Sequence, residues 1–328
     1  MKIDVTIDLG VIKRNIATYT GNVILMVKAD AYGHGLTEVA RAVDHLVYGY
    51  GVATIEEGVA LRECTNKEIF VFQWAKSEVP SALRSNLTLS VTDFGSLDYV
   101  KDKGVRGVLK VNTGMNRFGF DVEDAPLLKA KLQGVDVTGS CSHVYSGESL
   151  PAQQTLFDKW CAQLGGEDNH LLSSCYNHLP HNLIRVGIGA YEGAMTVTSR
   201  VVAVRRLKRG DNVGYGNTLS KDGNVAWIFG GYADGINRDN PQPVMIGNKL
   251  CNAVAVCMDS TAVFTGDYSP KIDEEAHLVG QHLTAKQIAE VTHTVPYVVM
   301  TSWRGRVKRT YICSSKRHEK SQGQGLPK

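Results

Sequence analysis

The chain has 328 residues, of which 43% are apolar and 21% charged, a composition that excludes a disordered or low-complexity protein. Lysine and arginine number 36 against 33 acidic residues, and the net charge of +3 does not indicate a nucleic-acid partner. The seven cysteines include no CxxC pair, so we expect neither a disulfide framework nor a metal site. Because no apolar run approaches the ~18 residues of a membrane span and a signal-peptide pattern is lacking, we expect a cytoplasmic protein without membrane association.

Short apolar runs alternate with amphipathic segments between about residues 22 and 190. The apolar runs predict strands at 23–28, 47–53, 68–75, 87–92, 105–111, 135–144, 170–175 and 183–190. The segments between them predict helices at 36–46, 55–64, 78–86, 94–103, 124–133 and 152–164. Strands and helices in alternation predict a parallel sheet of the α/β class, and eight such units over this length predict a (β/α)₈ TIM-type barrel.

Beyond about Arg200 the sequence changes to β-rich runs interrupted by glycine, aspartate and asparagine, and only residues 284–291 are expected to be helical there. This pattern predicts a mostly-β domain, either an antiparallel sandwich or a barrel. The expected layout is a barrel at 9–199 and a β domain at 200–313, with residues 1–8 forming a strand of the β domain. Residues 314–328 are polar without periodicity and are expected to be a disordered tail.

Lys28 ends the first apolar run and is followed by a loop containing Asp30, Tyr32 and two glycines. A lysine strongly prefers water, so one at the end of an apolar strand either extends to the surface or is desolvated. Desolvation lowers the pKa of an amine and prepares it to react with a carbonyl group. From the residues alone, both interpretations of Lys28 remain open.

The segment VKADAYGHG around Lys28 resembles the pyridoxal-phosphate lysine motif of the alanine racemase family. Further motifs follow in the family's order and span nearly the whole chain. They are GVATIEEGVALRE (51–63), KVNTGMNRFGF (110–120), SHVYS (142–146), LLSSC (171–175), IRVGIGAYEG (184–193), GDNVGYGNT (210–218), GYADG (231–235), VCMDS (256–260), TVPY (294–297) and RVKRTY (306–311). The resemblance implies a pyridoxal 5'-phosphate enzyme that interconverts L- and D-alanine for peptidoglycan, built as a barrel followed by a β domain.

The resemblance also implies two bases, one on each face of the substrate. Lys28 would hold the cofactor and act as one base, and Tyr232 of the partner subunit would be the other, so the resemblance implies a homodimer with shared sites. A tyrosine acts as a base near neutral pH only beside positive charges or hydrogen-bond donors, and His143 and Arg185 are the candidates. Arg185 would also face the pyridine nitrogen.

The remaining implied roles concern the cofactor phosphate and the substrate. Arg117 would bind the substrate carboxylate or assist Tyr232, and Lys110 is a candidate for a carbamate that holds Arg117 in place. Met258 and Asp259 would line the substrate entrance. The residues expected to bind the phosphate are Tyr32, Ser174, Tyr297 and the backbone of Gly187 and Ile188.

The chain departs from the family pattern at several positions, without losing a proton-transfer group. Ser173 replaces an asparagine, Val186 a proline and Val298 a glutamate, and residues 237–242 lack a tyrosine found in some members. Racemisation of serine or another small amino acid therefore stays open, as does a homologue that binds the cofactor without turnover. Related decarboxylases would be expected to carry a glutamate where Arg185 stands, and cofactor carriers of this barrel type typically lack the second domain.

Overall fold

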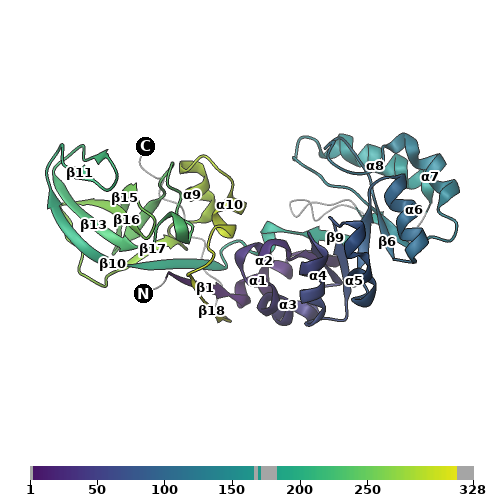
Figure 1. Cartoon of the computed structure of the whole chain (residues 1–328), viewed down its shortest axis with the longest axis horizontal. Helices are drawn as coiled ribbons and strands as arrows, with labels where there is room; N and C mark the ends of the chain where they lie inside the picture. Colours follow the sequence, from purple (N-terminus) through teal and green to yellow (C-terminus); the bar gives the residue numbers. More distant parts are fainter. Residues whose placement is uncertain (1–2, 166–168, 171–182, 316–328) are drawn as a thin grey trace. The chain divides into compact units, whose positions relative to one another are not determined.

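We describe the protein from a computed structural model, which covers residues 3–165, 169–170 and 183–315 (Figure 1). The expected tail at 314–328 therefore lies almost entirely outside the described residues. The chain divides into two compact units. The barrel unit consists of Ile12–Ala31 and Gly35–Tyr191, and the β unit of Met1–Val11, Tyr32–His34 and Glu192–Lys328.

The barrel unit contains, within its described residues, a parallel sheet of eight strands (Figure 1). Seven predicted strands overlap observed ones over most of the observed length, whereas the one predicted at 170–175 meets β8 only at His170 and otherwise lies outside the described residues. Neighbours in the sheet follow the chain order from β2 to β8, with β9 beside β2. The strands are β2 Asn22–Met26, β3 Gly49–Val52, β4 Glu68–Val71, β5 Thr88–Val91, β6 Gly107–Lys110, β7 Val137–Cys141, β8 Asn169–His170 and β9 Leu183–Val186. The TIM-type fold is confirmed, so the carboxyl ends of all these strands lie on one side of the sheet.

All six predicted helices of this region are present. They are α3 Leu36–Val43, α4 Ile55–Arg62, α5 Val79–Arg84, α6 Phe94–Lys103, α7 Ala125–Lys131 and α8 Leu150–Leu164. Two more helices, α1 Leu9–Ile16 and α2 Lys28–Gly33, were not predicted, and the 3₁₀ turns are η1 Asp44–Leu46, η2 Lys76–Glu78, η3 Val122–Asp124 and η4 Ile188–Ala190. Thr54 begins α4 with a capping box, its side chain accepting from the Glu57 N–H while the Glu57 carboxylate bonds back.

Five buried side chains from five different strands form a layer inside the sheet, and Phe72 packs against it. They are Ile24, Phe70, Val108, Cys141 and Leu183. Burying a side chain of the size of Ile24 or Phe70 contributes roughly 1.5–3 kcal/mol, so the layer is a strong anchor for the sheet. It fixes the strands whose carboxyl ends carry the candidate site.

The β unit is built on an antiparallel sheet that closes on itself. Strand β10 pairs with both β13 and β17, which completes a ring in the order β13, β16, β15, β14, β17 and β10. The ring strands are β10 Met195–Leu207, β13 Gly223–Phe229, β14 Pro243–Ile246, β15 Lys249–Val256, β16 Ser260–Gly266 and β17 Glu275–Val279, and β11 Asn212–Val213 pairs with β12 Asn217–Thr218. The mostly-β domain is confirmed, and of the two predicted forms the closed barrel is the observed one.

Strand β1, Asp4–Asp8, lies in the sheet of the β unit. It pairs antiparallel with β10 and parallel with β18, Lys308–Ile312. The Asp8 side chain accepts hydrogen bonds from the backbone N–H groups of Gly10, Val11 and Ser314. These bonds join the start of the chain to its last described strand.

The expectation that residues 284–291 form the one helix of this region was wrong. The predicted helix is α9 Ala285–Val291, with Thr284 as its cap, but α10 Pro296–Thr301 follows it. Pro296 occupies a first-turn position that tolerates proline, whereas two adjacent valines give the segment a low helix propensity. Burial of Val299 and Met300 stabilises what the local sequence does not favour. Among the residues described, no helix has both the length and the apolar character needed to cross a membrane.

Candidate functional site

The basic residues singled out in the sequence lie at the carboxyl ends of the barrel strands. Lys28 follows β2, Lys110 is the last residue of β6, and His143 comes after β7. Arg185 lies in β9, which pairs with β2. Residues separated by up to 157 positions in the sequence are thus placed at one end of one sheet, where barrel enzymes carry out their chemistry.

The segment directly after Lys28 is a left-handed helical turn. Ala29, Asp30, Ala31 and Tyr32 have φ values of 52°, 56°, 51° and 55°, and Gly33 follows at 81°. This conformation costs roughly 1–2 kcal/mol for each residue that carries a Cβ atom. Four such residues in succession store strain at the point where Lys28 leaves the sheet. The sequence predicted an ordinary loop here, because alanine, aspartate and tyrosine give no sign of a left-handed turn.

Hydrogen bonds from neighbouring segments hold the start of this turn. The Ala29 N–H donates to Oε1 of Glu57 at 2.7 Å. The Asp30 carboxylate accepts from the Leu36 N–H at 2.8 Å, and the Asp30 carbonyl oxygen accepts from the Gly35 N–H at 2.9 Å. The turn is therefore tied to α4 on one side and to the start of α3 on the other.

Arg185 is buried and held from three directions. Its Nη2 donates to the carbonyl oxygen of Ser142 at 3.2 Å and to Nδ1 of His143 at 3.3 Å. Its guanidinium carbon lies 4.6 Å from the centroid of the Phe72 ring, a cation–π contact. Since a guanidinium only donates, Nδ1 of His143 is the acceptor, and the ring proton of neutral His143 is on Nε2.

The cations of this cluster act on one another. Partial desolvation by the surrounding protein, followed by the charges of Arg185 and Arg117, lowers the pKa of Lys28, whereas Glu57 raises it. Burial, with the charges of Arg185, Lys110, Arg117 and Lys28, lowers the pKa of His143 to about 3. His143 is therefore neutral at physiological pH and acts as a hydrogen-bond donor and acceptor, not as a positive charge.

Lys110 has the most strongly altered amine in the cluster. Burial lowers its pKa to about 7, an effect that Cys141 opposes and that Arg185 and Arg117 strengthen. The residue is only 8% exposed. A large fraction of the Lys110 side chains is thus an unprotonated, nucleophilic amine near neutral pH.

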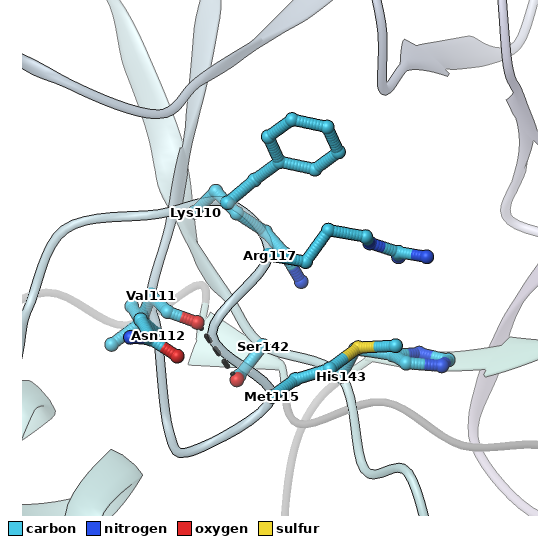
Figure 2. Close-up of a pocket in the computed structure, with 8 residues that line it drawn as sticks. Lys110, Val111, Asn112, Met115, Arg117, Ser142 and His143 are labelled. Carbon is cyan, nitrogen blue, oxygen red and sulfur yellow. Dashed lines mark hydrogen bonds between the residues drawn. The ribbon is translucent and has the colours of Figure 1, made fainter.

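A pocket lies beside Lys110 and is lined by residues of β6, of the loop after β6, and of the segment that follows β7 (Figure 2). Figure 2 shows the side chains of Arg117, Met115 and His143 extending to the same side of this pocket. Its wall is fixed by Gln153, whose Nε2 donates to Oγ1 of Thr113 and to the carbonyl oxygen of His143, both at 2.9 Å. Lys110 and Arg117, paired in the sequence prediction, therefore share one pocket.

In the β unit, Tyr232 begins the 3₁₀ turn η5, Tyr232–Asp234. A Cβ atom on Gly231 would lie 2.0 Å from the carbonyl oxygen of Cys257, so only glycine fits before the turn. The Tyr232 N–H donates to that same oxygen at 3.0 Å, which places the turn against the segment that carries Met258 and Asp259. The Tyr232 side chain is 39% exposed and lies 5.7 Å from the guanidinium of Arg238.

Arg306 joins this turn to Asp259. Its Nε and Nη2 donate to the two carboxylate oxygens of Asp234, both at 2.9 Å, and Nη2 also lies 2.6 Å from Oδ1 of Asp259. Asp234 is 1% exposed and also accepts from the Gly231 N–H at 3.0 Å. Arg306 thus joins the turn that carries Tyr232 to the segment that carries Met258 and Asp259.

Tyr32 and Tyr297 lie side by side in the β unit. Their ring centroids are 5.9 Å apart. Tyr32 is buried and Tyr297 is 43% exposed, so the pair has one buried and one accessible ring. Gly33, next to Tyr32, would place a Cβ atom 2.4 Å from the carbonyl oxygen of Met300, which explains a glycine in this left-handed position.

The predicted site residues fall into two groups, one in each unit. Ser174 lies outside the described residues. The barrel unit holds Lys28, Lys110, Arg117, His143, Arg185, Gly187 and Ile188, and the β unit holds Tyr32, Tyr232, Met258, Asp259 and Tyr297. Gly187 and Ile188 stand at the amino end of η4, where backbone N–H groups suit an anion.

The sequence did not indicate three residues that contact the predicted site or its neighbouring backbone. Glu57 accepts from the Ala29 N–H, Phe72 lies against Arg185, and Arg306 lies against Asp259. The Thr54–Glu57 spacing is typical of a capping box. The second contact of the Glu57 carboxylate, with the Ala29 N–H, joins residues 28 positions apart, and no local pattern predicts it. No sequence signal separates Phe72 from an ordinary core residue.

Comparison with known proteins assigns both units to domains of one protein family. A family model for the alanine racemase N-terminal domain matches residues 7–194, and one for the alanine racemase C-terminal domain matches residues 194–311. The chain is 33% identical to the alanine racemase of Thermodesulfovibrio yellowstonii, over 88% of this chain and 90% of that one. It is 29% identical to the alanine racemase of Mannheimia succiniciproducens, over 88% and 92% of the two chains.

Solved structures show the same fold. The alanine racemase of D-cycloserine-producing Streptomyces lavendulae superposes with a TM-score of 0.88 at 26% identity, covering 96% of this chain and 98% of that one. The alanine racemase of Bartonella henselae, solved with covalently bound pyridoxal phosphate, has a TM-score of 0.88 at 24% identity and covers 95% and 100% of the two chains.

Proposed function

This chain belongs to the alanine racemase family, and from that premise we propose that it interconverts L- and D-alanine with pyridoxal 5'-phosphate as its cofactor. One observation carries the proposal. Lys28, its pKa lowered, stands at the carboxyl end of a barrel strand beside the buried guanidinium of Arg185, in a chain that matches both family domains. The substrate is a small amino acid, and the product D-alanine would serve peptidoglycan synthesis.

The side chains present suit this cofactor. Lys28 offers an amine for the aldehyde carbon, and Arg185 and Arg117 supply positive charge for an anionic ligand. For the phosphate, the proposed contacts are Tyr32, Tyr297, Ser174 and the backbone of Gly187 and Ile188. When bound, the cofactor withdraws electrons and so stabilises the negative charge left on the substrate α-carbon after its proton is removed.

Two bases carry the proton in our proposal, one on each face of the substrate. Nζ of Lys28 takes or returns the α-proton on one face, and the lowering of its pKa by desolvation, Arg185 and Arg117 favours the unprotonated form that a base needs. Oη of Tyr232 of the partner subunit does the same on the other face. The exposure of Tyr232 and Met258, at 39% and 51%, supports a role for this surface opposite another chain.

In our proposal, Arg185 acts as a hydrogen-bond donor that stays protonated. The contacts to Ser142, His143 and Phe72 hold its guanidinium in place, and we propose that it faces the pyridine nitrogen. A donor whose pKa lies far above neutrality leaves that nitrogen unprotonated. Proton return to the α-carbon is then favoured over side reactions such as transamination.

Lys110 is proposed to carry a carbamate. Its unprotonated Nζ attacks the carbon of CO₂, a C–N bond forms, and the nitrogen releases one proton to water. The new negative charge would attract Arg117, which lines the same pocket and binds the substrate carboxylate. The lowered pKa of Lys110, about 7, supports the first step.

The proposed protein is a cytoplasmic homodimer in which each site takes Lys28 from one chain and Tyr232, Met258 and Asp259 from the other. The test is conversion of L-alanine to D-alanine by purified protein with added cofactor, beside L-serine and a Lys28→Ala variant. Alanine turnover that is lost in the variant supports the proposal, and the serine rate measures specificity. No turnover in a sample whose absorbance shows bound cofactor would overturn it.

Mixed dimers test the shared site. A Lys28→Ala chain and a Tyr232→Phe chain are each inactive or impaired alone, but a mixed dimer contains one complete site. Activity should therefore return on mixing, in proportion to the mixed dimers formed. A mixture as inactive as its components would show that each chain builds its site by itself.

A further inference from the structure

The carboxylate of Glu57 contacts two segments of the barrel unit at once. Oε2 accepts from the N–H groups of Ala53 at 2.7 Å and Thr54 at 3.4 Å, which completes the cap of α4. Oε1 accepts from the Ala29 N–H at 2.7 Å. Capping needs only the first oxygen, so the second serves the segment that carries Lys28.

Glu78 shows what a capping glutamate does elsewhere in the same sheet. It stands after β4, as Glu57 stands after β3, and its Oε2 accepts from the Ala75 N–H at 2.7 Å. The hydrogen bonds described for Glu78 stay within its own turn. The bond from Glu57 to Ala29 spans 28 residues and joins the β3–α4 loop to the residue after Lys28.

The bond to Ala29 falls where the backbone is most strained. Ala29 is the first of four successive residues with a Cβ atom and a positive φ. A left-handed turn persists only where its surroundings determine it, and a charged acceptor is a stronger partner than a neutral one. Glu57 thus acts on the residue whose φ sets how the chain departs from Lys28.

The charge of Glu57 has a second effect on Lys28. Arg185 and Arg117 both lower the pKa of Lys28, and Glu57 is the group that raises it. A carboxylate here therefore offsets part of the positive field at the amine. Its position is fixed by three backbone N–H groups, so this effect does not depend on a mobile side chain.

We propose that Glu57 is a positioning residue for Lys28, holding the Ala29 amide and thereby the direction of the Lys28 side chain, while its charge offsets Arg185 and Arg117. The proposal rests on the proposed function, in which Lys28 binds the cofactor and moves the proton. It assigns to the second of the three glutamates in GVATIEEGVALRE a role beyond the capping of α4.

The first test follows Lys28 in the cofactor-free protein. Competitive acetylation across a pH series, read by mass spectrometry of the Lys28 peptide, gives the pH at which the amine is half protonated. We compare wild type, Glu57→Gln and the matched control Glu78→Gln. The midpoint should fall in Glu57→Gln, since a charge that raises the pKa of Lys28 is removed, and stay at the wild-type value in Glu78→Gln. An unchanged midpoint in Glu57→Gln overturns the proposal.

The second test separates positioning from capping. Amide hydrogen exchange at Ala29 should be at least about tenfold faster in Glu57→Ala, because a bond to a charged acceptor is lost. Glu78→Ala should leave that exchange unchanged. In the loaded enzyme, kcat should fall at least about tenfold in Glu57→Ala, with KM for alanine less affected, while Glu78→Ala stays near wild type. Equal losses in the two alanine variants would show that capping explains the effect.

These measurements distinguish failure of the proposed role of Glu57 from failure of the proposed racemase function. The acetylation and exchange experiments use no substrate, so they test Glu57 even if the chain proves to act on another amino acid. If Glu57→Ala does not fold, Glu57→Gln retains the side-chain shape and one acceptor oxygen, and its Lys28 midpoint still decides. Alanine turnover in the wild type tests the proposed function independently of either variant.

Discussion

The barrel unit brings cations close to other cations, whereas the β unit pairs a cation with carboxylates. In the barrel unit, the charges of Arg185 and Arg117 add to burial in lowering the pKa values of Lys28 and Lys110. In the β unit, Arg306 bonds both oxygens of buried Asp234 and lies against Asp259. The pKa of Arg306 is accordingly raised by its hydrogen bonds to these carboxylates.

This contrast distinguishes a site from a scaffold. Neighbouring cations favour an anionic ligand that relieves their repulsion, and an amine whose pKa they help to lower, as at Lys110, is a better nucleophile. An arginine that is already paired with carboxylates, as Arg306 is, holds the segments that carry them in place but is not available to bind a ligand. We therefore propose that the barrel cations bind the ligand, with Lys28 as one of the two bases, and that Arg306 places Tyr232 and Asp259.

The largest effect is expected from Arg185→Ala. Turnover should fall about 10²–10³-fold, the usual loss when a preorganised charge is removed from a site. Because Arg185 lowers the pKa of Lys28, its removal should raise the pH of half-acetylation of Lys28 in the cofactor-free protein, opposite to the shift expected for Glu57→Gln. A downward shift, or none, would contradict the mutual repulsion that we assign to this cluster.

Lys110→Met tests, through stability, the burial and the neighbouring charges that lower the pKa of Lys110. The unfolded chain binds a proton at Lys110 up to its ordinary pKa of 10.5, whereas the folded chain releases it above about 7. Stability should therefore rise with pH between these values, by roughly 1.4 kcal/mol per pH unit, and this gain is lost as pH falls to 7. Denaturant unfolding in carbonate-free buffer measures it, and the slope should be smaller in Lys110→Met. Parallel curves for the two proteins would count against a buried, unprotonated Lys110.

Asp234→Asn tests the scaffold in the β unit. The substitution keeps the shape of a side chain that is 1% exposed but removes its charge and one acceptor oxygen. We expect a loss of about 1–3 kcal/mol in the free energy of unfolding, together with a drop in turnover, because the turn that carries Tyr232 loosens. Thermal denaturation and the alanine assay measure both quantities. The Lys28 acetylation midpoint should stay at its wild-type value, and a shift there would mean that the two clusters are not independent.

The elements of the fold were predictable because their signals are local. Short apolar runs located seven of the barrel strands within the described residues, and the pattern of residues 284–291 located α9. The left-handed turn was not predictable, because Ala29 is held by Glu57 and Asp30 by Gly35 and Leu36, and neither adopts the turn through its own preference.

The candidate site was predictable by residue type and motif, but its electrostatics were not. Family resemblance named Lys28, Lys110, His143 and Arg185, and left open whether His143 would act through charge or through hydrogen bonds. Only their grouping in space shows that His143 stays neutral and that the pKa of Lys110 reaches about 7. Such effects depend on contacts between residues far apart in the sequence, which no local pattern encodes.

The smallest expected effect concerns Phe72, which lies under the guanidinium of Arg185 at 4.6 Å. Phe72→Leu keeps an apolar side chain against the barrel core but removes the ring, and a buried cation–π contact is worth roughly 1–2 kcal/mol. Turnover should therefore fall only a few-fold, and the free energy of unfolding should fall by about 1–2 kcal/mol. Phe118→Leu is the matched control, since its ring lies 5.7 Å from Arg117 and is 48% exposed. If the two variants lose turnover equally, the contact with Phe72 does not help to hold Arg185, and its hydrogen bonds to Ser142 and His143 suffice.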